Sequence, residues 1–322
     1  MAISNFIKEK YGWDVTALSD WSPVYDEVIT DMIEQSTFMS KFKVLEGVKS
    51  KMQIPLMNAE ISLQAKVGCT ATPDGSVIFT EEEIETALLY MGVEFCNEDL
   101  NTKITEIFNV LGVKRQNEDI PADIKEVLLA YLMHLAEKAI QDLLILGDTT
   151  SLNPDLKHFD GMKKLMAGAG SNKVNVTATS ITSANAYTVA QELVEGSPAE
   201  IWETDNNVLL VTGTNEARSI IKQWNNDNPY NVINMPPLGG TFEVELPLLG
   251  VTIVAVPQLS GQNEMYTIPM RLWFLGTDLE SDIAFDVKYD SYNDKLKAEM
   301  SFRLGMQPVW LKYSSKVVLA TS

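Results

Sequence analysis

The sequence predicts an α+β protein of flat and extended form, on three observations. Residues 49–98 contain two long extended runs joined by a turn, and an isolated two-stranded hairpin is not stable alone in water. Residues 121–146 carry one long amphipathic pattern, and residues 283–304 alternate apolar and polar side chains with the period of a half-buried strand. Segments of this kind make few contacts within their own chain, so we expect the protein to need neighbours.

The composition is that of a folded and strongly acidic protein. Of the 322 residues, 45% are hydrophobic, which permits a core, and 21% are charged, which is ordinary for a globular chain. The formal net charge is −19. This charge weighs against a free nucleic-acid-binding protein, which needs a basic patch to displace counterions from phosphates, but not against a protein that surrounds DNA.

The chain carries no recognisable signal peptide or membrane span. The first residues, MAISNFIKEKYGWD, lack the basic and apolar regions of a signal peptide. No apolar run approaches the ~20 residues that cross a bilayer, so no membrane partner is expected. The two cysteines, Cys69 and Cys96, are simplest as reduced thiols, although a disulfide between them stays open.

Two predicted parts precede residue 99. Residues 1–48 mix loop with a helix that begins near Ser22 and Pro23. Residues 49–98 form the long arm, with a turn at Pro73-Asp74-Gly75, because proline presets φ and glycine accepts a positive φ. Near its tip lie residues without an evident partner in the chain, which we predict to contact other subunits: Lys66, Val67, Cys69, Val77 and Phe79.

The clearest helix begins at Pro121 and ends before Gly147, as helices with an N-terminal proline and a C-terminal glycine do. About 26 residues at 1.5 Å per residue give a rod of roughly 39 Å. One apolar stripe is predicted to face the core: Ile124, Val127, Leu128, Tyr131, Leu132, Leu135, Ala139, Leu143 and Leu146.

Residues 180–270 mix helices and strands. Residues 206–226 read as a buried strand, a turn and a helix. Two further strands are predicted, one within 246–259 that Pro257 closes and one over 264–276. Between the helix and the first of these two strands lies a loop, residues 225–240, that is long for a compact domain. Its apolar side chains, Val232 and Ile233 among them, are expected to be exposed, and five residues are predicted to contact other subunits: Trp224, Tyr230, Met235, Pro236 and Pro237.

An acidic run near the C-terminus begins like a calcium loop, with Asp278, Glu280 and Asp282. Such a loop needs glycine and glutamate where this chain has Ile283 and Tyr289, so the calcium interpretation fails. The alternating pattern instead predicts a hairpin strand. We expect its carboxylates to face the basic residues of the returning strand across the hairpin.

No constellation of residues points to catalysis. His134 and His158 lie in a helix and a turn, and there is no nucleophile elbow, P-loop or dinucleotide fingerprint. The strand, turn and helix over residues 206–226 have the shape of a nucleotide site but a single glycine. Carboxylates such as Glu81, Glu82 and Glu83 leave an Asp/Glu hydrolase open. We predict a protein that is not an enzyme, with no catalytic, metal or cofactor site.

Three stretches carry a more specific pattern: FDGM after the long helix, LLGVTIVAVPQL, and MYTIPMRLWFLGTDLESDIAFDVKYDSYNDKLKAEMSFRLGMQPVW. With the order of elements, they resemble the major capsid proteins of tailed bacteriophages, which have the Hong Kong 97 fold, over nearly the whole chain. The resemblance implies five parts: an N-arm (1–48), an extended E-loop hairpin (49–98), a peripheral domain with a long spine helix (99–179), a mixed α/β axial domain (180–270), and the long β-hairpin of the peripheral domain with a C-terminal strand (271–322).

The resemblance also implies a function and partners. The chain would assemble with itself into hexamers and pentamers of an icosahedral shell, in the host cytoplasm and then the virion, around double-stranded DNA that it does not read. A portal protein and decoration proteins are implied partners, and the short segment before the E-loop implies a scaffolding protein from a separate gene. Some members crosslink an E-loop lysine, for which Lys66 is the candidate, with non-covalent contact as the alternative. An encapsulin-type compartment shell and a soluble α/β enzyme using Asp or Glu stay open.

Overall fold

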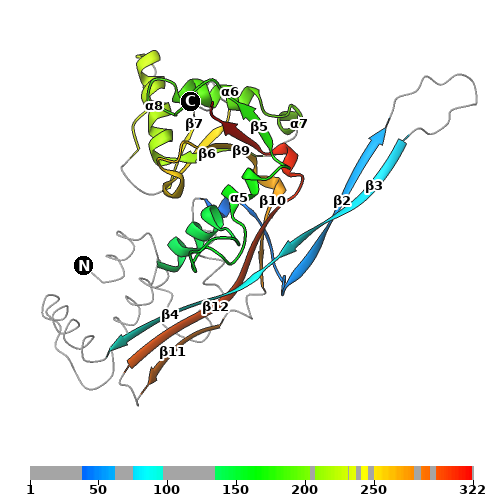
Figure 1. Cartoon of the computed structure of the whole chain (residues 1–322), viewed down its shortest axis with the longest axis vertical. Coiled ribbons are helices and arrows are strands. Elements are labelled where there is room, and N and C mark those ends of the chain that lie inside the picture. Colours follow the sequence, from blue (N-terminus) through cyan, green and yellow to red (C-terminus); the bar gives the residue numbers. More distant parts are fainter. Residues whose placement is uncertain are drawn as a thin grey trace, which may run out of the picture.

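The computed structural model describes residues 38–61, 75–96, 135–203, 207–230, 232–236, 241–245, 250–278, 284–290 and 295–320. Within these residues the strands form three sheets, of five, six and two strands. The two-stranded sheet projects from the body as an arm, and the long strands of the five-stranded sheet extend away from it on the other side (Figure 1). The described part of the molecule is therefore extended, as the sequence predicts.

The five-stranded sheet is organised around β12 (Lys295–Pro308). Its order is β1-β10-β12-β11, and β4 pairs with the opposite edge of β12 along residues 295–304. The other strands are β1 (Lys43–Leu45), β4 (Ala87–Cys96), β10 (Trp273–Thr277) and β11 (Ala284–Asp290). The predicted C-terminal hairpin is confirmed as the antiparallel pair β11 and β12.

The predicted pairing of opposite charges across this hairpin is confirmed at some positions and wrong at others. Asp290 lies opposite Lys295 in the register, and Arg303 of β12 lies 3.5 Å from Asp278. The register places Asp286 opposite Glu299 and Lys288 opposite Lys297, and like charges face each other at both positions. Lys297 instead meets Glu94 of β4, with 3.4 Å between Nζ and Oε1. A sequence pattern predicts which residues of a strand alternate, but it does not predict which strands pair. Here β4, which pairs with the other edge of β12, supplies the opposite charge for Lys297.

The six-stranded sheet has the order β5-β13-β9-β6-β8-β7. Its strands are β5 (Asn172–Asn175), β6 (Val208–Gly213), β7 (Phe242–Glu245), β8 (Thr252–Val256), β9 (Met265–Pro269) and β13 (Ser315–Val318). Helices α6 (Ala186–Glu195) and α8 (Thr214–Asp227) cover one face (Figure 1). A core of its own fills the space beneath them, with Leu193, Ile220 and Ile253 fully buried. Two short α-helices, α5 (Met162–Ala167) and α7 (Glu200–Glu203), also lie wholly within the described residues.

The strand predicted over residues 264–276 is two strands. β9 ends at Pro269, a turn of 3-10 helix covers Met270–Leu272, and β10 begins at Trp273. Proline has no N–H to continue a ladder, so the pairing of β9 stops there. The chain then passes from the six-stranded sheet into the five-stranded sheet, which a local reading of apolar residues does not reveal.

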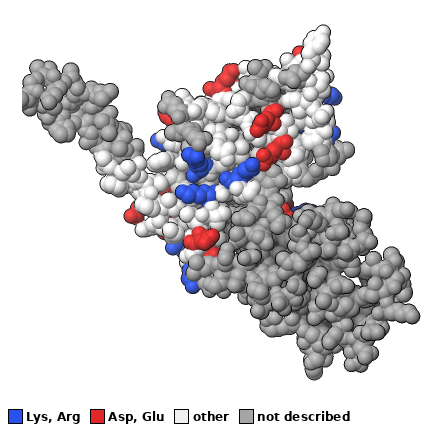
Figure 2. Space-filling model, turned by 180° about the vertical axis from the view of Figure 1, so that it is seen from behind, with Lys and Arg blue, Asp and Glu red and all other residues white. Residues whose placement is uncertain are grey.

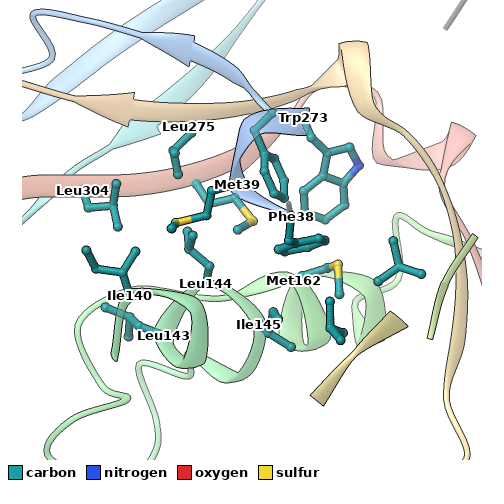
Figure 3. Packing of buried hydrophobic residues seen from close by; sticks show 14 of the residues in the cluster. Phe38, Met39, Ile140, Leu143, Leu144, Ile145, Met162, Trp273, Leu275 and Leu304 are labelled. Atoms are coloured by element: carbon teal, nitrogen blue, oxygen red, sulfur yellow. The ribbon is translucent and has the colours of Figure 1, made fainter. Parts of the chain in front are cut away.

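The largest core lies between the two larger sheets and the long helix. Phe38 and Met39 are fully buried in it, and Figure 3 shows them beside Leu144 and Met162. Trp273 is also fully buried and donates its indole N–H to the Ser314 hydroxyl at 3.0 Å. Because Ser314 directly precedes β13, this bond ties the five-stranded sheet to the six-stranded sheet.

The described part of the long helix, residues 135–146, corrects the predicted apolar stripe. Leu135 is 41% exposed and Ala139 is also exposed, so the core uses a neighbouring stripe. Because this helix segment carries apolar residues on more than one side, its sequence does not show which side packs against the sheet. The buried positions are Ala136, Ile140, Leu143, Leu144 and Ile145. Leu143 of the predicted stripe is thus confirmed, and Leu146 is partly buried against the same core.

Candidate functional site: the extended arm and the exposed loops

The arm is the antiparallel pair of β2 (Lys51–Ile61) and β3 (Gly75–Glu85). Its register runs from Lys51 opposite Glu85 at the root to Ile61 opposite Gly75 further out. The second extended run of the sequence does not belong wholly to the arm. It is divided at Thr86, after which the chain joins the five-stranded sheet as β4.

One face of the arm root is buried against the body. Ile54, Leu56 and Ile84 lie at alternate positions of the two strands and pack in a small separate core with Phe274 and Val309. Leu56 and Ile84 are buried, Ile84 completely. This inward face holds the arm to the five-stranded sheet on the side away from the long helix.

The opposite face carries exposed apolar residues beyond the root. Met57 is 59% exposed, and Phe79, directly across the ladder from it, is 74% exposed. Val77 lies two positions before Phe79 in β3, nearer the arm tip, and is 54% exposed. We call Met57, Val77 and Phe79 the outward patch. An apolar surface on a ribbon of two strands has no layer of its own chain to cover it.

The same face becomes acidic toward the root, where Glu81, Glu83 and Glu85 follow the outward patch. Lys51 lies between them, with its Nζ 2.7 Å from Glu83 and 3.5 Å from Glu85. The hydrogen bond to Glu83, and then the two nearby negative charges, raise the pKa of Lys51. These exposed pairs add little stability, but they keep the root polar.

A cleft of about 350 Å³ separates the arm root from the loop that follows the long helix. Its walls are Glu83 and Glu85 on the arm and Thr149 and His158 on the loop. The floor is formed by apolar and polar residues of three elements, Phe159, Leu165, Met306 and Gln307.

That loop, residues 148–160, is held by a charged cluster. Lys164 of α5 contacts Asp148 at 2.5 Å and Asp160 at 3.1 Å. The hydrogen bond from Lys164, followed by those from Thr150, lowers the pKa of Asp148 to about 2. Between these anchors, Leu152 is fully exposed at the loop tip. The loop therefore exposes an apolar residue at its tip, while the ion pairs of Lys164 hold its two ends.

The loop after α8 is tied to its own domain at several points. The Asn225 side chain accepts from the Ile233 N–H at 2.8 Å and donates to its carbonyl at 2.9 Å. Arg218 donates to the carbonyl of Pro236 at 2.8 Å. Tyr230 projects fully exposed from this loop, and Val232 and Met235 are exposed too.

Two predicted exposures in this loop region are wrong. Trp224 belongs to the last turns of α8, is buried, and packs at 5.5 Å between ring centroids against Tyr187. Ile233 is partly buried against the core under α6 and α8. Trp224 is turned inward because it lies on the buried face of α8, with Ile220 and Ile221.

The predicted contact residues thus fall into separate places. Val77 and Phe79 share the outward patch, and Met57, which the sequence analysis missed, completes it. Met57 could be identified only from the strand register, which places it opposite Phe79. Tyr230, Met235 and Pro236 belong to the loop that follows α8. Four residues lie outside the described residues: Lys66, Val67, Cys69 and Pro237.

The described charged residues form no metal-ligand cluster, and on one face they form a small mixed group. No three described His, Cys, Asp or Glu residues are grouped as metal ligands. Among the described helices, none combines the length and the apolar composition needed to cross a membrane. On the face shown in Figure 2, the Lys and Arg residues form a small group near the arm base, with Asp and Glu around it.

The sequence matches no protein-family model and no curated protein. Solved structures match by their fold. A chain of the satellite phage P4 procapsid has 10% identity and a TM-score of 0.58, over 93% of this chain and 99% of its own. A chain of the native GTA particle capsid has 12% identity and a TM-score of 0.59, over 88% and 89%. The capsid of Myoviridae phage XM1 gives 12% and 0.56, over 88% and 92%.

This chain has the Hong Kong 97-type capsid fold. The arm of β2 and β3 is its E-loop, and β11 with β12 is its long hairpin. The helix of residues 135–146 is the described part of the spine helix, and the six-stranded sheet with α6 and α8 forms the axial unit. The residue boundaries of the five parts stay predictions, and residues 1–37 of the N-arm lie outside the described residues.

Proposed function

We propose that this chain is the major capsid protein of a tailed bacteriophage. It assembles into hexamers and pentamers of an icosahedral shell that encloses double-stranded DNA. The observation that carries the proposal is the outward patch of the E-loop, where Met57, Val77 and Phe79 are all more than half exposed on an unbacked ribbon. Such a surface is expected to be covered by a partner.

The partner we propose is another copy of the same chain. The outward patch and the exposed loop around Tyr230 lie on different elements, so one chain offers at least two unlike apolar surfaces. Unlike surfaces that meet between identical chains make heterologous contacts, which close into rings when the rotation permits. Rings of five and six subunits follow naturally from contacts of this type, as the fold's capsid neighbours suggest.

The charge of the chain supports a container rather than a DNA-binding wall. A net charge of −19 repels phosphates and leaves packaged DNA free to move. We accordingly propose no sequence-specific DNA contact and no catalytic role. A portal protein, decoration proteins and a separately encoded scaffolding protein are the proposed partners, and the virion, assembled in the host cytoplasm, is the proposed location.

Electron microscopy of the purified protein, with size-exclusion chromatography, tests the proposal. We expect rings, shells or shell fragments, and nucleic acid in particles taken from an infected cell. Particles filled with an enzyme cargo would instead indicate an encapsulin-type compartment. A monodisperse monomer over a wide range of salt and pH would contradict assembly. Uniform closed shells from this chain alone would contradict the separate scaffolding protein.

The variant Phe79→Ser tests the outward patch itself. It removes the most exposed aromatic residue of the patch, so we expect a folded subunit that no longer assembles. Ile78→Ser is the matched control, because Ile78 is its neighbour on β3, is 54% exposed, and points to the opposite face. Equal assembly by the two variants would mean that the outward patch is not the contact.

A further inference from the structure

Two glycines lie where the E-loop crosses the five-stranded sheet. Gly276 of β10 and Gly305 of β12 are directly opposite each other in the antiparallel ladder. Directly opposite residues project to the same face of a sheet. That face is the one on which the E-loop root packs, since Phe274 shares it with Gly276 and belongs to the small core of Ile84 and Leu56.

Both glycines are required by space and not by backbone conformation. The described glycines with positive φ are Gly47, Gly250 and Gly261, so neither member of the pair is among them. A Cβ at Gly305 would lie well under 3.0 Å from the backbone carbonyl oxygen of Glu85. A Cβ at Gly276 would lie 2.9 Å from Cδ1 of Ile84 and 3.0 Å from Cγ2 of Thr86.

Hydrogen bonds fix the crossing point beside this pair. Thr86 donates its N–H to the Ser50 carbonyl at 2.8 Å and its hydroxyl to the Val48 carbonyl at 2.9 Å. Val48 in turn donates its N–H to the carbonyl of Thr277, the residue after Gly276, at 2.9 Å. The start of β2 and the end of β3 are thus tied to each other and to the sheet at one place.

We propose that the pair Gly276 and Gly305 aims the E-loop. By letting the backbone of Glu85 and Thr86 lie directly on the sheet, the pair sets the angle at which the arm leaves the body. β3 extends over eleven residues from Gly75 to Glu85. At about 3.3 Å per residue this is roughly 36 Å, so a tilt of about 10° at the root moves the far end by about 6 Å.

The second part of the inference rests on the proposed function. The angle of the arm decides where the outward patch of one copy meets the next copy. A change of a few ångströms is enough to misplace side chains that must interdigitate. The glycine pair is therefore a positioning element for assembly, although neither glycine belongs to the contact surface.

The arm angle can be measured in the isolated subunit by electron spin-echo distances. Spin labels at Met57→Cys on the arm and at Lys222→Cys on the exposed side of α8, in a background with Cys69→Ser and Cys96→Ser, report the arm direction. Met57 lies six residues from the root, roughly 20 Å, so we expect the tilt of about 10° caused by Gly305→Ala to shift the distance by about 3–4 Å. An unshifted distance in a folded Gly305→Ala subunit would overturn the aiming role.

Three further variants separate steric displacement from general destabilisation. Gly92→Ala is the matched control, since Gly92 is also a strand glycine of this sheet but its Cβ would meet only the movable ring of Tyr90, at 2.8 Å. It should leave the distance unchanged. Gly276→Ala should give a smaller shift than Gly305→Ala, because it meets side-chain ends. Adding Ile84→Val should reduce that shift by removing Cδ1, while Cγ2 of Thr86 remains in place. A shift with Gly92→Ala, or an undiminished shift when Ile84→Val is added, contradicts the steric cause.

Assembly is scored separately by counting particles and measuring their diameter in electron micrographs. We expect Gly305→Ala to lower the yield of closed particles about tenfold or to change their diameter, and Gly92→Ala to match the wild type. If the arm moves while yield and diameter stay at wild-type values, the link from arm angle to assembly is wrong. These assays supply the scaffolding protein together with the chain. If the wild type then forms no particles, the proposed function fails, whereas the spin-label distances still decide the aiming role.

Discussion

Replacing Ile84 by alanine should loosen the E-loop root while the rest of the molecule stays folded. Ile84 is fully buried in the small core that joins the arm to the five-stranded sheet. The change deletes three carbon atoms, for a transfer loss of about 2.5 kcal/mol at ~0.8 kcal/mol per buried group. Gly276 lies directly beneath and has no side chain to fill the gap, so a cavity term brings the expected loss to about 3–4 kcal/mol.

Ile78→Ala is the matched control for this prediction. Ile78 lies on the same strand and the same face, but it is 54% exposed because it is beyond the sheet. Its loss should be about 1 kcal/mol or less. Urea unfolding gives the global stability of both variants, and native-state hydrogen exchange gives the opening free energy of the β2 and β3 amides.

We expect exchange in the arm to accelerate in Ile84→Ala more than the urea transition moves. The reason is that the arm root has its own core, distinct from the two larger ones. Equal losses for Ile84→Ala and Ile78→Ala would refute the assignment of an inward face. A loss that appears only in the global transition, with arm exchange unchanged, would show that the root is part of the main core.

Three other perturbations have defined outcomes. The lowered pKa of Asp148, about 2 against an ordinary 3.8, means that its carboxylate stabilises the fold above pH 3.8, and that this contribution is lost as pH falls through about 2. In acid titrations followed by circular dichroism, Asp148→Asn should remove that pH dependence. Asn225→Ala should release Ile233 and speed amide exchange in the loop before Pro236, with the axial core unchanged. Deleting residues 66–76 should leave a subunit with a cooperative unfolding transition that cannot assemble.

Each of these has a control and a contrary result. Asp155→Asn changes an exposed carboxylate of the same loop, and an equal effect of both substitutions on the acid titration would deny the special role of Asp148. Asn226→Ala changes the exposed neighbour of Asn225. Equal amide exchange in both variants would mean that the hydrogen bonds between Asn225 and Ile233 do not hold the loop. Loss of cooperative unfolding in the deletion variant would make the arm tip part of the core.

The elements whose evidence is local could be predicted from the sequence alone. The alternation after residue 283 identified the strands of the long hairpin, and the extended runs after residue 49 identified the arm. Val77 and Phe79 could be predicted as exposed because the arm has no second layer to bury them. The order of such elements was enough to indicate the capsid fold, since order survives where residue identity does not.

Contacts between residues far apart in the sequence could not be predicted before the fold was known. The division at Thr86, the break after Pro269 and the inward turn of Trp224 depend on the sheet or helix that each segment joins. Gly276 and Gly305 are single glycines within strands, a signal of close backbone approach that gives no partner. The two glycines lie 29 positions apart. The Glu85 backbone, which lies where a Cβ at Gly305 would be, comes much earlier in the sequence. Periodicity is a property of neighbours in sequence, whereas clearance and register arise only when separate segments are brought together.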